Sequence, residues 1–113
     1  MRLYISGPIG GYADGNLPAF AAAATRLQQK GHEPVNPHDI SGDHDGPCAR
    51  GKASSMVDHE HRYGCYLIQD LAGLAQCDGL FALRGWQNSP GAKAEVAFAE
   101  ALKLEILYEE EGD

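Results

Sequence analysis

The segment DGLFALRGWQNSPGAKAEVAFAEALKLEILY, residues 78–108, predicts a strand, a helix and a second strand in succession. The apolar run at 78–83 has the composition of a buried strand, and GWQNSPG at 85–91 is typical of a turn. Residues 90–103 follow a helical period, and LEILY at 104–108 forms the last strand. Because a helix that joins two parallel strands is the repeating unit of α/β proteins, this segment predicts an α/β fold.

The alternation of strands and helices extends back to the N-terminus. We expect strands over 2–6 and 32–36, and helices over 16–30 and 60–77. The pattern predicts a mainly parallel sheet with helices on both faces. Ligands of such sheets bind beyond the carboxyl ends of the strands. That rule indicates the loop after the first strand, the polar segment after the second, and the turn 85–91.

The first helix has recognisable ends. Asn16 is a candidate N-cap, Pro18 lies in the first turn, and Gly31 follows the last turn. These residues predict a helix that begins and ends within the interval 16–30.

Two segments depart from this alternation. Residues 37–58 are polar and without periodicity, so we expect a lid, a binding loop or a mobile segment there. We find no repeat and no linker. Residues 1–108 are therefore expected to form a single domain that includes a long loop at 41–58, followed by a solvated acidic tail at 109–113.

Composition narrows the class of protein. The chain has 113 residues, 43% of them hydrophobic and 22% charged, which fits one globular domain. Its net charge of −7 argues against binding a nucleic-acid polymer or an anionic membrane, and no apolar run approaches a membrane span. Cys48, Cys65 and Cys77 are odd in number and form no CxxC motif, so we expect reduced thiols in a cytoplasmic protein.

A carboxylate lies on the apolar side of the helix 90–103. At about 100° per residue, Glu95 falls beside Phe98, Ala99 and Leu102. The polar side of this helix carries Lys93, Glu100 and Lys103. Burying a carboxylate is costly unless it is paired, so Glu95 needs a specific reason to face inward. Stabilisation by the helix dipole is the structural alternative to a functional site.

The preceding helix repeats this arrangement. Asp70 shares its side with Leu67, Leu74 and Cys77. A backbone cap or an ion pair could explain it alone, but two inward acids next to one strand favour a site. Paired carboxylates can act as nucleophile and general acid, as in the cleavage of glycosidic bonds.

The predicted loops contain residues that indicate a binding site less strongly than the two carboxylates do. The glycine-rich YISGPIGGY could cradle an anion through its backbone, or could simply form a tight turn. Ser89 is a good N-cap at the start of a helix that could also bind an anion. Trp86 could stack on a base or cover the edge of the core. The HEH motif at 59–61 lacks the spacing of a zinc site with Cys48 or Cys65, so we expect neither a metal nor a cofactor.

Three motifs together resemble the nucleoside 2-deoxyribosyltransferase superfamily, including its short members and the 2'-deoxynucleoside 5'-phosphate N-hydrolases. They are YISGPI in the first strand, D-x(7)-D at Asp70 and Asp78, and S-x-G-x-x-x-E at Ser89, Gly91 and Glu95. The resemblance covers most of residues 1–108 except the loop 41–58. It implies a Rossmann-like (flavodoxin-like) sheet of four or five strands.

The resemblance also implies roles for individual residues. Glu95 matches the nucleophile that attacks the anomeric carbon, Asp70 matches the acid that handles the proton of the leaving base, and Tyr4 matches a tyrosine near the active site. Ser89 matches a serine that binds phosphate in the nucleotide hydrolases. The candidate substrate-binding residues are Ser6, Gly7, Pro8, Ile9, Asp78, Trp86, Asn88, Ser89 and Gly91.

These features predict an enzyme that cleaves the N-glycosidic bond of a 2'-deoxynucleoside or its 5'-monophosphate, by hydrolysis or base transfer, through a covalent glycosyl-enzyme intermediate. The expected partner is therefore a small nucleoside or nucleotide, and the resemblance implies a homodimer or a larger homo-oligomer. One alternative is a non-catalytic nucleotide-binding module with the same fold. A weaker alternative is a metal-binding regulatory protein that uses the histidine-rich loop.

Overall fold

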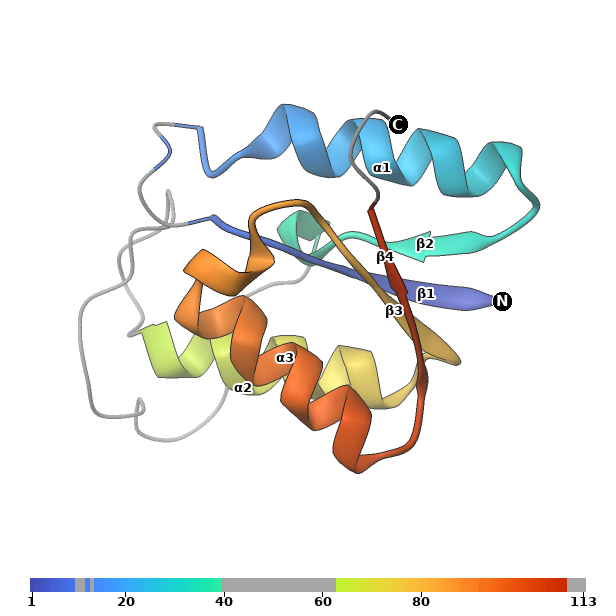
Figure 1. Ribbon diagram of the computed structural model, residues 1–113. Coiled ribbons are helices and arrows are strands. Elements are labelled where there is room, and N and C mark those ends of the chain that lie inside the picture. Colours follow the sequence, from blue (N-terminus) through green and yellow to red (C-terminus); the bar gives the residue numbers. More distant parts are fainter. Residues whose placement is uncertain (10–11, 13, 40–62, 110–113) are drawn as a thin grey trace.

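The computed structural model describes residues 1–9, 12, 14–39 and 63–109, and for 63–66 the backbone only. The chain alternates between strands and helices as expected (Figure 1). The strands are β1 (Arg2–Ser6), β2 (Glu33–Val35), β3 (Gly79–Ala82) and β4 (Glu105–Tyr108). The α-helices are α1 (Leu17–Gln29), α2 (Tyr63–Ala75) and α3 (Pro90–Ala101), and single 3-10 turns form η1 (Pro37–Asp39) and η2 (Trp86–Asn88).

The four strands form one all-parallel sheet in the order β2-β1-β3-β4. Tyr4 of β1 lies opposite Val35 on one side and Leu80 on the other, so β1 is central. This is the flavodoxin-like strand order, here with four strands. After β1 the chain forms β2 on one side of that strand, and it then crosses to form β3 on the other side. The switch point of the topology, where the strand order changes direction, therefore lies between β1 and β3.

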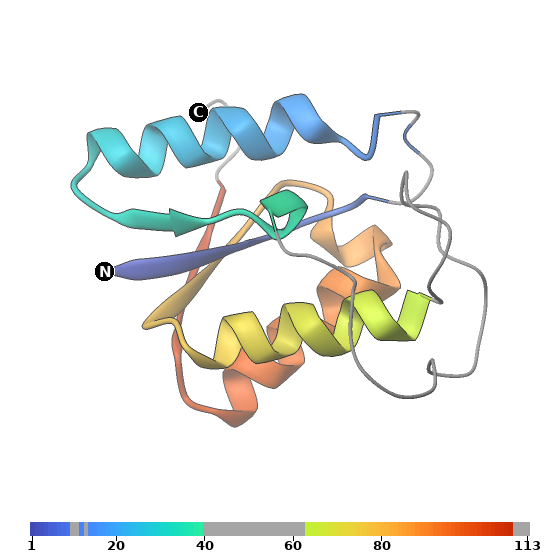
Figure 2. The same ribbon diagram turned by 180° about the vertical axis from the view of Figure 1, so that it is seen from behind.

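Helices cover both faces of the sheet, which confirms the predicted α/β architecture. α1 lies on one face, and α2 and α3 lie on the other (Figures 1 and 2). Side chains of β1 alternate between these layers. Leu3 and Ile5 pack with Phe20 of α1, whereas Tyr4 joins the core under α2 and α3.

The ends of α1 agree with the sequence prediction, except for the role of Asn16. Pro18 lies in the first turn of α1, and Gly31 follows that helix at φ +85°, both as predicted. Asn16 occupies the N-cap position, but its side chain does not cap the helix. It has a left-handed backbone, and its amide instead donates to the carbonyl of Pro8 at 2.9 Å, which fastens the helix start to the loop after β1.

The C-terminal boundary also differs from the prediction. Glu109 belongs to the folded domain, because its N–H donates to the Ala82 carbonyl at 2.8 Å and its carboxylate pairs with Arg26. Leu102, expected on the apolar side of the last helix, is 45% exposed because α3 ends at Ala101. The predicted long loop at 41–58 and residues 110–113 lie outside the described residues. In the described part of the chain, no helix is long and apolar enough to cross a membrane.

Gly79→Ala is expected to destabilise the sheet. A Cβ atom at this position would lie 2.6 Å from the backbone carbonyl oxygen of Glu105 and 3.0 Å from the side chain of Leu3. Since a backbone oxygen cannot rotate away, β3 and β4 must separate, at a cost of about 1–3 kcal/mol. Urea unfolding measures this change. Gln28→Ala, on the exposed side of α1, is the control and should leave the free energy of unfolding nearly unchanged.

Candidate active site

The carboxylate of Glu95 is buried between α3 and β1, with only 5% of the residue exposed. Both of its oxygens accept a hydrogen bond from a buried hydroxyl. Tyr4 Oη donates to Oε2 at 2.6 Å, and Ser6 Oγ donates to Oε1 at 2.7 Å. The inward carboxylate predicted from the helical period therefore exists, and its burial is compensated by two charge-assisted hydrogen bonds.

The secondary structure explains how these three side chains meet. Tyr4 and Ser6 are alternate residues of β1, so they point to the same face of the sheet. Glu95 lies on the buried side of α3, which packs on that face. Ser6 is the last residue of β1. These three residues, the Glu95 cluster, thus lie toward the carboxyl end of a central strand, next to the switch point of the topology.

Asp70 of α2 adds a second carboxyl group to this region. Burial, followed by the charge of Glu95, raises the pKa of Asp70 to about 8. The pKa of Glu95 is raised as well, because burial outweighs the hydrogen bonds from Tyr4 and Ser6, which act in the opposite direction. Because the donors favour the ionised form of Glu95, we place the proton of this coupled pair on Asp70.

The hydroxyl of Tyr4 stays protonated in this setting. Burial and the neighbouring charges of Glu95 and Asp70 raise the pKa of Tyr4 far above its usual range. Tyr4 therefore donates its hydroxyl proton to the hydrogen bond with Glu95 at neutral pH. The four groups form a protonated acid, an ionised carboxylate and two hydroxyl donors.

Asp70→Asn is expected to change how stability depends on pH. The ordinary pKa of an aspartate is near 3.8, whereas that of Asp70 in the folded protein is about 8. Between these values the folded chain retains a proton that the unfolded chain has released, so stability falls as pH rises. Chemical denaturation should show Asp70→Asn gaining about 4 kcal/mol relative to the parent between pH 4.5 and pH 7.5. A constant difference between the two proteins would contradict the raised pKa.

The loop after β3 contributes candidate residues of several kinds. Ser89 caps α3, since its Oγ accepts a hydrogen bond from the N–H of Ala92 at 3.2 Å, as predicted. Trp86 is half-buried against the core, and its ring lies 5.8 Å from that of Tyr108, which fits the edge-covering alternative. Asn88 is exposed and Gly91 is buried at the start of α3.

The loop after β1 is held by packing. A Cβ atom on Gly7 would lie 2.8 Å from Leu83, so glycine is required there by the close approach of β1 and β3. The carbonyl of Pro8 accepts the hydrogen bond from Asn16, and Ile9 packs against the core under α1. These contacts favour a packed turn for residues 7–9, and Gly10 and Gly11 lie outside the described residues.

Asp78 does not join the other candidates. It precedes β3, and its carboxylate accepts a hydrogen bond from the N–H of Arg2 at 2.8 Å. Arg2 begins β1 and Ser6 ends it, so Asp78 lies at the amino end of the strand, roughly 7 Å along β1 from Tyr4 and roughly 13 Å from Ser6. The prediction of Asp78 as a substrate-binding residue is therefore withdrawn, because Asp78 fastens the amino ends of β1 and β3, whereas ligands of such sheets bind beyond the carboxyl ends.

Ser6 is a predicted substrate-binding residue, and its hydrogen bond to Glu95 is an addition from the structure. The available signal was the i, i+2 spacing of Tyr4 and Ser6, which places both hydroxyls on one face of a strand. Among the described residues, no three His, Cys, Asp or Glu side chains gather as a metal site. The predicted histidine-rich segment, with His44, His59 and His61, lies outside those residues.

A family model described as "Domain of unknown function (DUF4406)" matches residues 1–108. The match spans all the described secondary structure, from β1 to β4. No curated protein matches the chain.

Proposed function

We propose that this chain, which belongs to the family described as DUF4406, cleaves the N-glycosidic bond of a 2'-deoxynucleoside or its 5'-monophosphate. The observation that carries the proposal is the buried Glu95 carboxylate, held by Tyr4 and Ser6 beside a second carboxyl group at Asp70. Two carboxyl groups whose environments favour different protonation states are the usual arrangement for cleaving a glycosidic bond.

In the first step, an oxygen of ionised Glu95 forms a bond to C1' of the sugar while the bond from C1' to the base nitrogen breaks. The electron pair of that bond goes to the base, which receives the proton of Asp70. The products of this step are a glycosyl ester on Glu95, an ionised Asp70 and a neutral free base. The raised pKa of Asp70 supplies the acid at neutral pH.

In the second step, water or a second base attacks C1', and the ester bond to Glu95 breaks. The proton released by the attacking group returns to Asp70, so both carboxyl groups regain their starting states. Tyr4 and Ser6 orient the carboxylate in both steps, since each donates to a different oxygen. Attack by water gives hydrolysis, and attack by a base gives transfer.

The resemblance to the nucleoside 2-deoxyribosyltransferase superfamily supports this proposal through the same residues. Its most specific motif, at Ser89, Gly91 and Glu95, opens α3 directly after the loop that follows β3. Ser89 lies at the N-terminus of α3, where the backbone N–H groups favour an anion. This position is compatible with a 5'-phosphate on the substrate.

A chromatographic assay tests the function. The protein is incubated with a panel of deoxynucleosides and their 5'-monophosphates, with and without a second free base. Released base supports cleavage, and the responding member of the panel identifies the substrate. A new nucleoside in the two-base mixture makes the enzyme a transferase. Absence of turnover, with a nucleotide still raising the melting temperature, would favour the non-catalytic binding module.

We also propose a homodimer, on the resemblance alone. Light scattering coupled to gel filtration tests it, and a mass near the 12.1 kDa of one chain would contradict it.

A further inference from the structure

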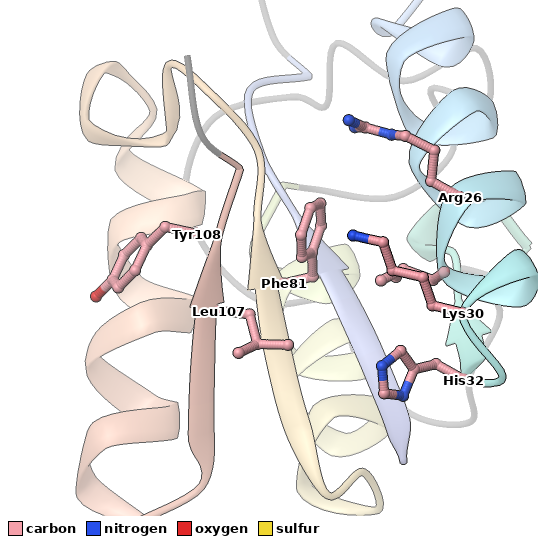
Figure 3. Close-up of a pocket in the computed structure, with 7 residues that line it drawn as sticks. Arg26, Lys30, His32, Phe81, Leu107 and Tyr108 are labelled. Carbon is pink, nitrogen blue, oxygen red and sulfur yellow. The ribbon is translucent and has the colours of Figure 1, made fainter. Parts of the chain in front are cut away.

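A groove lies on the face of the sheet opposite Glu95, between α1 and the strands β3 and β4 (Figure 3). Its volume is ≈ 630 Å³, which is within the range of small-molecule sites. Phe81 and Leu107 line the sheet side, and Arg26, Lys30 and His32 line the opposite wall. Tyr108 also borders the groove, and its side chain points away from it (Figure 3).

The groove exists because α1 covers only part of its face of the sheet. α1 packs over β1 and β2, and in the described part of the chain no helix covers β3 and β4 on this side. Phe81 and Leu107 consequently remain only partly buried. They provide an apolar floor that a flat ring could cover.

The wall formed by α1 is cationic. Arg26 and Lys30 are four residues apart, so their side chains lie on the same side of the helix and reach over the groove (Figure 3). Arg26 already binds a carboxylate, that of Glu109. Within the described residues, no carboxylate pairs with Lys30, which leaves a cation beside the apolar floor of a chain whose net charge is −7.

We propose that this groove binds a small organic anion with a planar apolar body. The anionic group pairs with Lys30, next to the imidazole of His32, and the ring covers Phe81 and Leu107. Charge complementarity selects the anion, because Lys30 has no carboxylate partner among the described residues, whereas Arg26 is already paired with Glu109. The proposal is independent of the glycosidase reaction, since the groove and the Glu95 cluster lie on opposite faces of the sheet.

The probe pair is 2-naphthoate and its neutral analogue 2-naphthamide, titrated into the ¹⁵N-labelled protein and followed by amide chemical shifts. We expect saturable shifts at Lys30, His32, Phe81 and Leu107 with naphthoate, and markedly weaker binding of naphthamide. Lys30→Gln should weaken naphthoate binding about two- to fivefold, as for an exposed ion pair. Lys103→Gln, which removes an exposed lysine after α3, is the matched control and should have no effect.

Several results would overturn the proposal. These are equal binding of naphthoate and naphthamide, shifts confined to other residues, or unchanged affinity in Lys30→Gln. A shortened chain that ends at Glu109 is titrated in the same way and compared with the full chain. If naphthoate binds only to that shortened chain, the groove is the site of residues 110–113 and not of a free ligand, and the proposal fails.

Discussion

Glu95→Gln should fold normally and lose the release of base, with a rate at least about 10³-fold below that of the parent. The amide has the shape of the carboxylate but cannot form the ester bond to C1'. The fold should persist, because the hydroxyls of Tyr4 and Ser6 can rotate, one to donate to the amide oxygen and the other to accept from its nitrogen. Removing a buried charge also removes its desolvation cost.

The control for this variant lies on the same helix. Glu100 is exposed, so Glu100→Gln makes the same chemical change outside the cluster and should keep full activity. Circular dichroism and the melting temperature establish that both variants are folded. A folded Glu95→Gln protein with the activity of the parent would exclude covalent catalysis by Glu95. The same activity loss in Glu100→Gln would show that the effect is not specific to the site.

The fold was accessible from sequence because its signals are local. The strands at 2–6 and 104–108 and the turn at 85–91 are marked by apolar runs and by Gly, Pro and Asn, and each corresponds to an observed element. The inward direction of Glu95 followed from the helical period alone. Such patterns report which side of an element is buried, and they do so before any partner is known.

The errors concern contacts between segments far apart in sequence. The sequence predicts Asp78 in the site, but its partner is the N–H of Arg2 on the neighbouring strand. The sequence predicts a solvated tail that includes Glu109, yet Glu109 pairs with Arg26 on α1. A polar residue near a predicted boundary has many possible partners, and only the strand register and the helix placement select one.

The Glu95 cluster contains one feature that the sequence predicts and one that it does not. Helical periodicity predicted that Glu95 is buried, but not that two hydroxyls of β1 compensate it. Those donors depend on α3 packing over the first strand, which lies about ninety residues earlier. The proximity of Asp70 to Glu95 likewise depends on how α2 and α3 pack on the same face of the sheet.

Asp70→Asn is expected to reduce base release by about 10²–10⁴-fold and to alter its pH profile. In the parent, the proposed reaction needs Asp70 protonated, so the rate should decline as pH rises through about 8, the pKa that burial and Glu95 give this group. Asparagine has no proton to transfer, so the residual activity of the variant should lack that decline. The rate is measured between pH 5 and pH 9.5 with the best substrate of the panel.

A substrate with an activated leaving group separates proton transfer from a structural role. If Asp70 acts as the acid, a base that leaves without protonation should restore much of the lost rate in Asp70→Asn, because the bond to C1' then breaks without the missing proton. If Asp70 has only a structural role, Asp70→Asn should lose the same factor in rate with both substrates. A parent profile that stays flat to pH 9.5 would contradict the acid role, since it would mean that ionising Asp70 has no effect on the step in which the base departs.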